Sequence, residues 1–118
     1  MKLSVDAYLN EELIEEDRLR LELYRRLSLC ESAGEVYEIE EEIADRFGKL
    51  DRVTRQFIDI MVMKVLAREQ GVSKLSSYGE KVFVAFLDAD RQRETLKSPS
   101  KDDDDIIATA MAYLKRKT

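Results

Sequence analysis

The sequence predicts an α+β fold in which helices come first, a small antiparallel sheet follows, and a C-terminal helix ends the chain. Three observations predict this order. Apolar residues recur with helical spacing from residue 15 to residue 70, alternation of period two replaces that spacing after Gly71, and helical spacing returns after residue 102. The length of 118 residues suits a single domain over residues 1–118.

The predicted N-terminal elements are a strand and a helical hairpin. Apolar and polar residues alternate from Leu3 to Leu9, which predicts a short half-buried strand. Glu15–Cys30 shows both alternation and helical spacing, and its length and its Leu, Arg and Glu content favour a helix. Ser32 and Glu35 have the spacing of a capping box for a second helix, which we expect to end at Gly48.

The middle of the chain predicts a third helix and a β-hairpin. The helix runs from about Asp51 to Gln70, and its broad apolar set makes it the helix that we expect to be most buried. Val72–Ser77 and Glu80–Leu87 flank Tyr78-Gly79, which indicates a hairpin. The second of these strands has apolar residues at both alternating sets of positions, so we expect both of its faces to be covered.

The C-terminal segment predicts a linker and a final helix. Lys97–Lys101 contains Ser-Pro-Ser and is typical of an internal linker. The helix opens with the aspartates Asp102–Asp105 and ends in Lys115-Arg116-Lys117, an arrangement that complements the helix dipole. Four consecutive aspartates lack the spaced pattern of a calcium loop, so we interpret them as a solvated helix start.

The composition argues against an enzyme. The chain has no His and one Cys, so it has no imidazole base, no Ser-His-Asp or Cys-His pair and no disulfide within the chain. Its four glycines are too dispersed for a phosphate-binding loop. No stretch approaches the ~20 apolar residues of a membrane span, and no signal peptide is recognisable. We therefore expect a cytoplasmic binding module without catalytic residues, metal or cofactor.

Charge is divided unevenly along the chain. Residues 1–51 carry 15 Asp and Glu against 7 Lys and Arg, a net charge of −8, whereas residues 52–118 carry 10 against 13, a net charge of +3. An acidic first half suits a partner with a basic face. The second half lacks the clustered positive charge that direct nucleic-acid binding requires, so no such binding is expected.

An acidic strip on the predicted second helix is the candidate partner-binding site. Helical spacing places Glu38, Glu42 and Asp45 outside the apolar face, with Arg46 at their border. One interpretation is local, because Glu42 and Arg46 form an i,i+4 pair worth roughly 0.2–0.5 kcal/mol. The other is a docking strip for arginines of a partner, beside the negative end of the helix dipole. Composition alone favours the local interpretation.

Two segments resemble a known family. RLELYRRL at residues 20–27, followed by Glu31-Ser32, Glu35-Val36 and EIADRFG at residues 42–48, is similar without a gap to the C-terminal domain of bacterial transcription-repair coupling factor (TRCF, also called Mfd). Weaker similarity continues through the third helix and the strand at Val82–Phe86. The resemblance implies a non-catalytic regulatory domain of a larger protein.

The implied full-length protein is an ATP- and magnesium-dependent DNA translocase. It would bind double-stranded DNA, displace stalled RNA polymerase and recruit the excision-repair subunit UvrA. The resemblance also implies that this domain packs on a UvrB-like module of the same protein and masks its UvrA-binding surface, through Glu42, Asp45 and Arg46. It thereby reverses the preference for the local interpretation. A free-standing acidic helical adaptor with an unrelated partner is the alternative.

Overall fold

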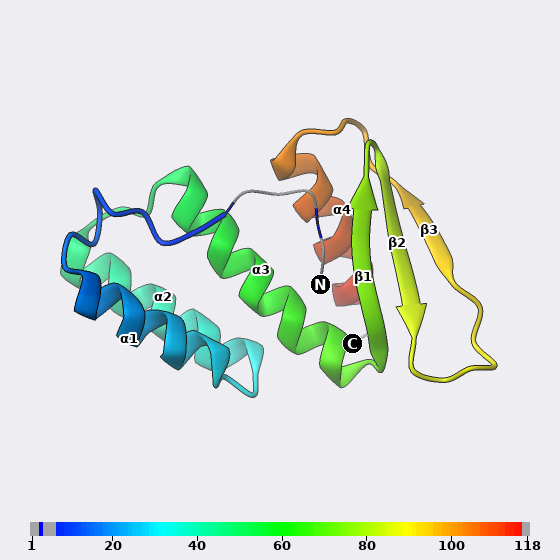
Figure 1. Cartoon of the computed structure of the whole chain (residues 1–118), viewed down its shortest axis with the longest axis horizontal. Helices are drawn as coiled ribbons and strands as arrows, with labels where there is room; N and C mark the ends of the chain where they lie inside the picture. The colour runs from blue at the N-terminus through cyan, green and yellow to red at the C-terminus, as the bar shows by residue number, and fades with distance from the viewer. Residues whose placement is uncertain (1–2, 4–6, 117–118) are drawn as a thin grey trace. The chain divides into compact units, whose positions relative to one another are not determined.

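Helices and strands follow one another along the chain in the order that the sequence predicts for an α+β fold (Figure 1). The computed structural model describes residues 3 and 7–116. The helices are α1 (Asp17–Ser28), α2 (Ala33–Phe47), α3 (Arg52–Glu69) and α4 (Asp103–Arg116), and the strands are β1 (Val72–Tyr78), β2 (Lys81–Phe86) and β3 (Glu94–Lys97). The chain groups into two compact units, one of residues 7–65 and one that contains the residues from Leu66 onward. The boundary between them falls within α3.

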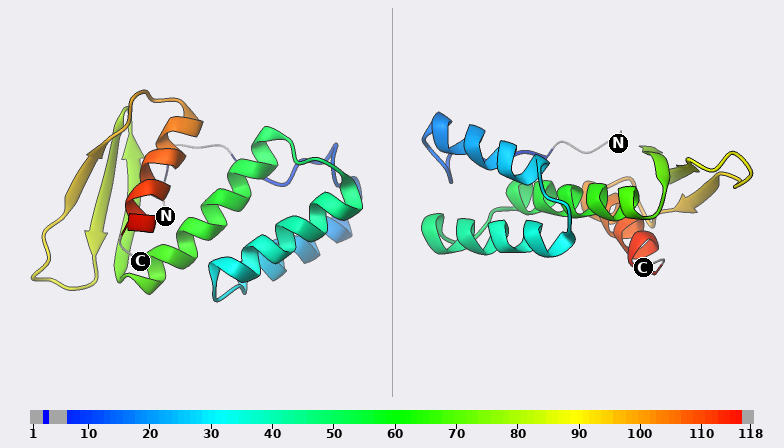
Figure 2. Two further views of the ribbon diagram at one scale, coloured as in Figure 1. Left: turned by 180° about the vertical axis from the view of Figure 1, so that it is seen from behind. Right: turned by 90° about the horizontal axis from the view of Figure 1, so that it is seen from below.

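In the unit of residues 7–65, α1 and α2 form the predicted antiparallel hairpin (Figure 2). Ser32 is the N-cap of α2, and its Oγ accepts a hydrogen bond from the Glu35 backbone N–H at 3.2 Å. The Glu35 carboxylate in turn accepts from the backbone N–H of Glu31 at 2.7 Å, one residue before the N-cap. Gly48 follows the helix with φ 99°, a conformation that favours glycine. The capping residues therefore set both ends of α2.

A polar cluster holds the N-terminal segment against the start of α3. The Thr54 hydroxyl donates to Asp51 Oδ1 at 2.6 Å and accepts from the Asn10 backbone N–H at 3.1 Å. Asn10 Nδ2 also donates to Asp51 Oδ2 at 3.1 Å. Burial opposes ionisation of Asp51, but these hydrogen bonds outweigh it and lower the pKa of its carboxyl. The cluster fixes the segment through side chains.

The strand predicted over Leu3–Leu9 is not found at the positions that are described. Leu3 and residues 7–10 belong to no strand, and residues 4–6 lie outside the described residues. The backbone N–H of Leu9 donates to the Tyr24 hydroxyl at 2.8 Å, so a side chain of α1 takes the place of a neighbouring strand. Alternation predicts which residues face the core, and Leu9 is indeed buried, but it does not supply a strand to pair with.

The third helix carries more buried side chains than any other helix, as predicted. Its buried residues are Thr54, Gln56, Ile58, Met61, Val62, Met63, Val65, Leu66 and Ala67. They surround most of the helix, which explains why α3 lacks a wide polar face. Both methionines at positions 61 and 63 are core residues.

In the unit that begins at Leu66, β1, β2 and β3 form an antiparallel sheet in that order, and α4 packs on one face (Figures 1 and 2). Val82 and Val84 of β2 point to the covered face and are fully buried. The expectation that both faces of this strand are covered is wrong. Phe83 is 36% exposed and Leu87 is 74% exposed, because α4 is a single layer on the other side of the sheet.

The segment before α4 is more ordered than the predicted linker of residues 97–101. Lys97 is the last residue of β3, a strand that the sequence did not predict. Ser98 is buried, and its backbone N–H donates to the Glu80 carbonyl at 2.7 Å. The Ser100 hydroxyl donates to the Asp105 carboxylate at 2.6 Å. These bonds tie the segment to the hairpin turn and to the first turn of α4.

Candidate partner-binding site on α2

The residues predicted for the acidic strip all lie on α2, outside its buried positions. Val36, Ile39 and Ile43 form the buried side of the helix. The residues of the strip occupy other positions on the same helical turns. Glu38, Asp45 and Arg46 are exposed, while Glu42 is half-buried. The amphipathic spacing of the sequence dictates this separation, because residues three and four apart share one side of a helix. We use the name acidic strip for Glu38, Glu42 and Asp45, with Arg46 at the border.

Glu42 is held by an arginine of the neighbouring helix. Arg26 of α1 donates to both carboxylate oxygens of Glu42, at 2.5 Å and 3.2 Å. Arg46 lies farther away, with its Nη1 3.9 Å from Glu42 Oε2. The predicted i,i+4 pair therefore exists, but the bidentate partner is 16 residues away in sequence. Sequence reasoning missed Arg26, because its contact with Glu42 joins two different helices.

These contacts set the charge of the strip. The hydrogen bond from Arg26 lowers the pKa of Glu42, with smaller contributions of the same sign from the charges of Arg26 and Arg46. The same bond raises the pKa of the Arg26 guanidinium. Arg46 also lies over the Phe47 ring, 5.2 Å from its centroid. Glu42 is therefore ionised at neutral pH and partly balanced by two arginines.

Glu38 and Asp45 differ from Glu42, because neither forms a salt bridge with any other described residue. Both carboxylates are exposed on the last three turns of a helix whose C-terminal carbonyls add negative potential. The outward negative charge of the strip therefore comes mainly from these two residues. Such an arrangement can bind arginine or lysine side chains by charge and hydrogen bonding.

A shallow hollow of about 500 Å³ lies on the other flank of α2, next to the start of α3. Tyr37, Glu40 and Ala44 line it from α2, and Leu50 and Arg55 line it from the next segment. Burial raises the pKa of Glu40, and the nearby charge of Asp59 adds to this, while Arg55 opposes it. Sequence reasoning did not identify this hollow, because its two walls come from different helices.

The other candidate features of the sequence have structural roles. Cys30 is buried, and burial raises the pKa of its thiol. Asp103, Asp104 and Asp105 form the first turn of α4. Within residue 3 and residues 7–116, no group of three or more His, Cys, Asp or Glu side chains is arranged to hold a metal ion. Over the same residues, no helix combines the length and apolar character needed to cross a membrane.

Comparison with known proteins identifies relatives of this chain. A segment of a transcription-repair-coupling factor from Helicobacter pylori (strain ATCC 700392 / 26695) is 49% identical over 115 residues, which is 98% of this chain and 11% of that protein. A transcription-repair-coupling factor from Mycobacterium bovis is 37% identical over 75 residues, which is 64% of this chain and 6% of that protein. The chain thus spans only about a tenth of the length of the curated relatives that it matches.

The fold is also that of a solved structure. A crystal structure of the C-terminal domain of transcription-repair coupling factor superposes with a TM-score of 0.79 at 18% sequence identity, covering 99% of this chain and 93% of that one. The family model of the TRCF domain matches residues 3–96, which include the hairpin, α3 and most of the sheet. The chain therefore belongs to the TRCF domain family of transcription-repair coupling factors.

Proposed function

We propose that this chain is a regulatory docking domain, and that the acidic strip on α2 is its contact surface. The partner is a UvrB-like module of the same full-length protein, whose UvrA-binding surface the domain masks in the resting state. The observation that carries the proposal is the pair of exposed carboxylates of Glu38 and Asp45, which have no salt-bridge partner among the described residues. They lie beside Glu42, which two arginines already hold.

The arrangement suits a contact that opens and closes. Exposed charge pairs contribute roughly 0.2–1 kcal/mol each, so a few of them give a closed state that competing partners can displace. Arg26 keeps the Glu42 carboxylate oriented before any partner arrives, at distances of 2.5 Å and 3.2 Å. Such preorganisation reduces the entropy that docking would otherwise cost.

The activity of the full-length protein follows from its family. We propose an ATP- and magnesium-dependent translocase on double-stranded DNA that displaces stalled RNA polymerase and recruits UvrA, with this domain contributing regulation and no catalytic group. A free-standing adaptor is not favoured, because the curated relatives contain the matching segment as 11% of a longer chain.

The proposal is tested in the full-length coupling factor that carries this chain. Glu42→Lys combined with Asp45→Lys reverses the strip, and we expect the apparent affinity for UvrA to increase roughly tenfold, because the masked state loses its charge contacts. Binding of immobilised UvrA, measured by biolayer interferometry on parent and variant, checks this. If the variant binds UvrA no better than the parent, the strip is not the masking contact.

Two further variants make the result specific. Glu11→Lys with Glu12→Lys changes the net charge equally at exposed positions outside α2, and should leave UvrA binding unchanged. Glu38→Lys with Asp45→Lys reverses the strip without removing the Arg26–Glu42 pair, so loss of that pair cannot account for its effect. We expect it to increase UvrA binding as well.

A further inference from the structure

The face of the sheet that α4 leaves uncovered carries positive charge on all three strands. Its strand residues are Lys74, Ser76 and Tyr78 of β1, Lys81, Phe83 and Ala85 of β2, and Thr95 and Lys97 of β3. The register aligns Ser76, Phe83 and Thr95 in one row across the sheet. No acidic residue occupies a strand position on this face. We call it the open face.

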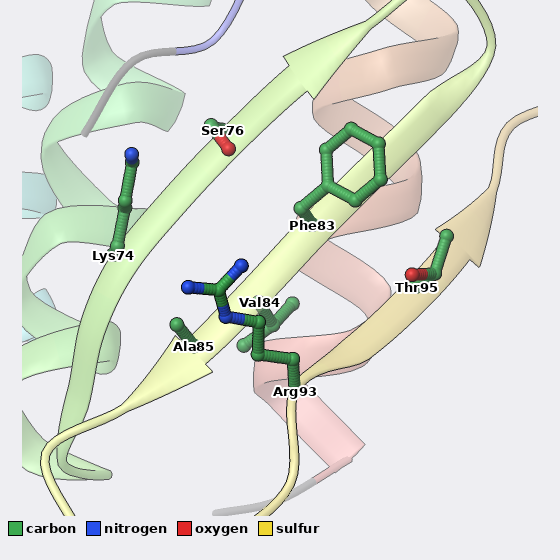
Figure 3. Close-up of a pocket in the computed structure, with 7 residues that line it drawn as sticks. All are labelled: Lys74, Ser76, Phe83, Val84, Ala85, Arg93 and Thr95. Atoms are coloured by element: carbon green, nitrogen blue, oxygen red, sulfur yellow. The ribbon is translucent and has the colours of Figure 1, made fainter.

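A shallow depression of about 480 Å³ lies on the open face. Its apolar floor comes from the side chains of Phe83 and Ala85 of β2, whereas the side chain of Val84 between them points to the covered face. The Arg93 side chain reaches from the loop before β3 across β2 toward Ala85, the register partner of Lys74, so both cations lie at the Ala85 end of the depression (Figure 3). The depression therefore combines an apolar floor with two cations.

No residue that the structure describes neutralises the cations of this face. Lys74, Lys81, Arg93 and Lys97 are exposed, and none of them forms a salt bridge with another described residue. The nearby Arg91 differs, because its guanidinium lies 3.7 Å from the centroid of the Phe86 ring. Of the acidic residues around the sheet, Glu94 accepts a hydrogen bond from Tyr113 of α4 on the covered side. The open face thus presents four cations that are available to a ligand.

The chemistry of the face indicates its ligand. An apolar floor with two cations beside it is complementary to an apolar side chain that has carboxylates next to it in the sequence. A nucleic acid fits less well, because four cations are few for tracking a phosphate backbone, and the chain as a whole carries a net charge of −5. The hydroxyls of Ser76 and Thr95 on either side of Phe83 can bond to the backbone of an extended peptide.

We infer that the open face binds an extended acidic segment of a protein partner, with an apolar side chain of that segment on Phe83 and its carboxylates at Lys74 and Arg93. This surface lies on the strands, whereas the acidic strip lies on α2. The two surfaces have opposite charge, so they select different partners. The inference is independent of the masking role proposed for the strip.

The test uses the 118-residue chain and a defined probe. The probe is a fluorescein-labelled eight-residue peptide with two leucines flanked by glutamates, and binding is measured by fluorescence anisotropy. We expect saturable binding that weakens as salt is added. Lys74→Glu with Arg93→Glu should weaken it roughly tenfold or more, since two attractions become repulsions. Phe83→Ala should weaken it roughly fivefold by removing the apolar floor.

Matched controls decide the outcome. Lys64→Glu with Lys101→Glu makes the same change in net charge at exposed positions outside the sheet and should leave the dissociation constant within about twofold. Circular dichroism confirms that each variant is folded. The inference is overturned if the peptide does not bind, or if the control pair weakens binding as much as the Lys74 and Arg93 pair. It is also overturned if a twelve-nucleotide oligothymidine binds more tightly than the peptide.

Discussion

The Glu42 side chain is held by contacts within the fold and is still part of an exposed surface. Its carboxylate accepts two hydrogen bonds from Arg26 and lies 3.9 Å from Arg46, yet its side chain remains 36% exposed. A partner that approaches the strip therefore meets an oriented carboxylate rather than a freely rotating one. The cost of ordering that side chain has already been met on folding.

Removing Arg26 should change the titration of Glu42 more than the stability of the domain. In Arg26→Ala, we expect the pKa of Glu42 to rise toward its ordinary value, because the hydrogen bond that lowers it is lost. The free energy of unfolding near neutral pH should fall by less than about 1 kcal/mol, because the pair is partly exposed and screened. Carboxylate chemical shifts in an NMR titration and urea unfolding provide the two measurements.

The sign of the pH dependence follows from the lowered pKa. The Arg26–Glu42 pair contributes its full stabilisation of the folded state at pH values above the unfolded-state pKa of glutamate, about 4.3. That contribution is lost as the pH falls through the lower folded-state value. Parent and Arg26→Ala should therefore converge in stability at low pH. Arg26→Lys keeps the charge but not the bidentate geometry, so its stability near neutral pH should lie between those of the parent and Arg26→Ala. An unchanged titration of Glu42 in Arg26→Ala would contradict the assignment.

At the level of single residues, the sequence predicted local relations and missed distant ones. The capping bond between Ser32 and Glu35 and the pair of Glu42 with Arg46 are each within four positions, so spacing alone identifies them. Arg26 lies 16 positions from Glu42, and its contact depends on the rotation of two packed helices about their axes. Periodicity identifies the faces of each helix but does not fix which residues meet.

The elements with strong signals at their ends were predicted well. Ser32, Gly48 and Gly71 mark the start of α2, its end and the transition from α3 to β1. β3 has only four residues, and its identity as a strand comes from its pairing with β2. The alternating residues near Leu9 show the opposite, because their pattern predicted a strand that was not found. The Leu9 backbone N–H donates to a side chain of α1 and not to a neighbouring strand. A short strand is defined by its partner, and a partner is not a local property.

The bond between Tyr113 of α4 and Glu94 of β3 should give the docking of this helix a specific pH dependence. Tyr113 is buried, and its hydroxyl donates to the Glu94 carboxylate. Burial first, and then this hydrogen bond, raise the pKa of Tyr113 to about 12. The neutral phenol is thus favoured in the folded state. The protonated phenol of Tyr113 contributes its full stabilisation of the folded state below the unfolded-state pKa of tyrosine, about 10. This stabilisation is lost as the pH rises toward 12.

Tyr113→Phe removes both the bond and this titration. We expect the variant to lose about 1 kcal/mol near neutral pH, and the difference from the parent to shrink between about pH 10 and pH 12. Urea unfolding followed by circular dichroism across that pH range measures both. Tyr78→Phe is the matched control, because Tyr78 is 81% exposed and should have no comparable effect. A constant difference between Tyr113→Phe and parent over this range would show that the phenol does not titrate as described.

At the scale of the whole chain, charge separates by element. The acidic strip lies on α2, in the half of the sequence that carries a net charge of −8, and the cationic open face lies on the sheet, in the half that carries +3. The sequence revealed this imbalance but not the open face, because both alternating sets of residues in β2 include apolar side chains. Which set remains exposed depends on the side to which α4 packs.

The two compact units should unfold together, because α3 belongs to both. Its residues up to Val65 group with the hairpin and those from Leu66 group with the sheet, and it has buried side chains on each side of that boundary. Part of a helix gains little from remaining folded alone, since helix formation is cooperative. We therefore expect one unfolding transition for the chain. Loss of core packing in either unit should lower its midpoint for every element.

Ile43→Ala in α2 and Leu75→Ala in β1 test this from opposite units. Both residues are buried, so each change should cost roughly 2–4 kcal/mol. Amide NMR signals of α2 and of β2, followed through a urea titration, should disappear at one shared midpoint in each variant. Leu21→Ala is the control, because Leu21 is 68% exposed and should shift the midpoint little. If Ile43→Ala lowers the midpoint of α2 while β2 unfolds at the urea concentration of the parent, the shared helix does not couple the units.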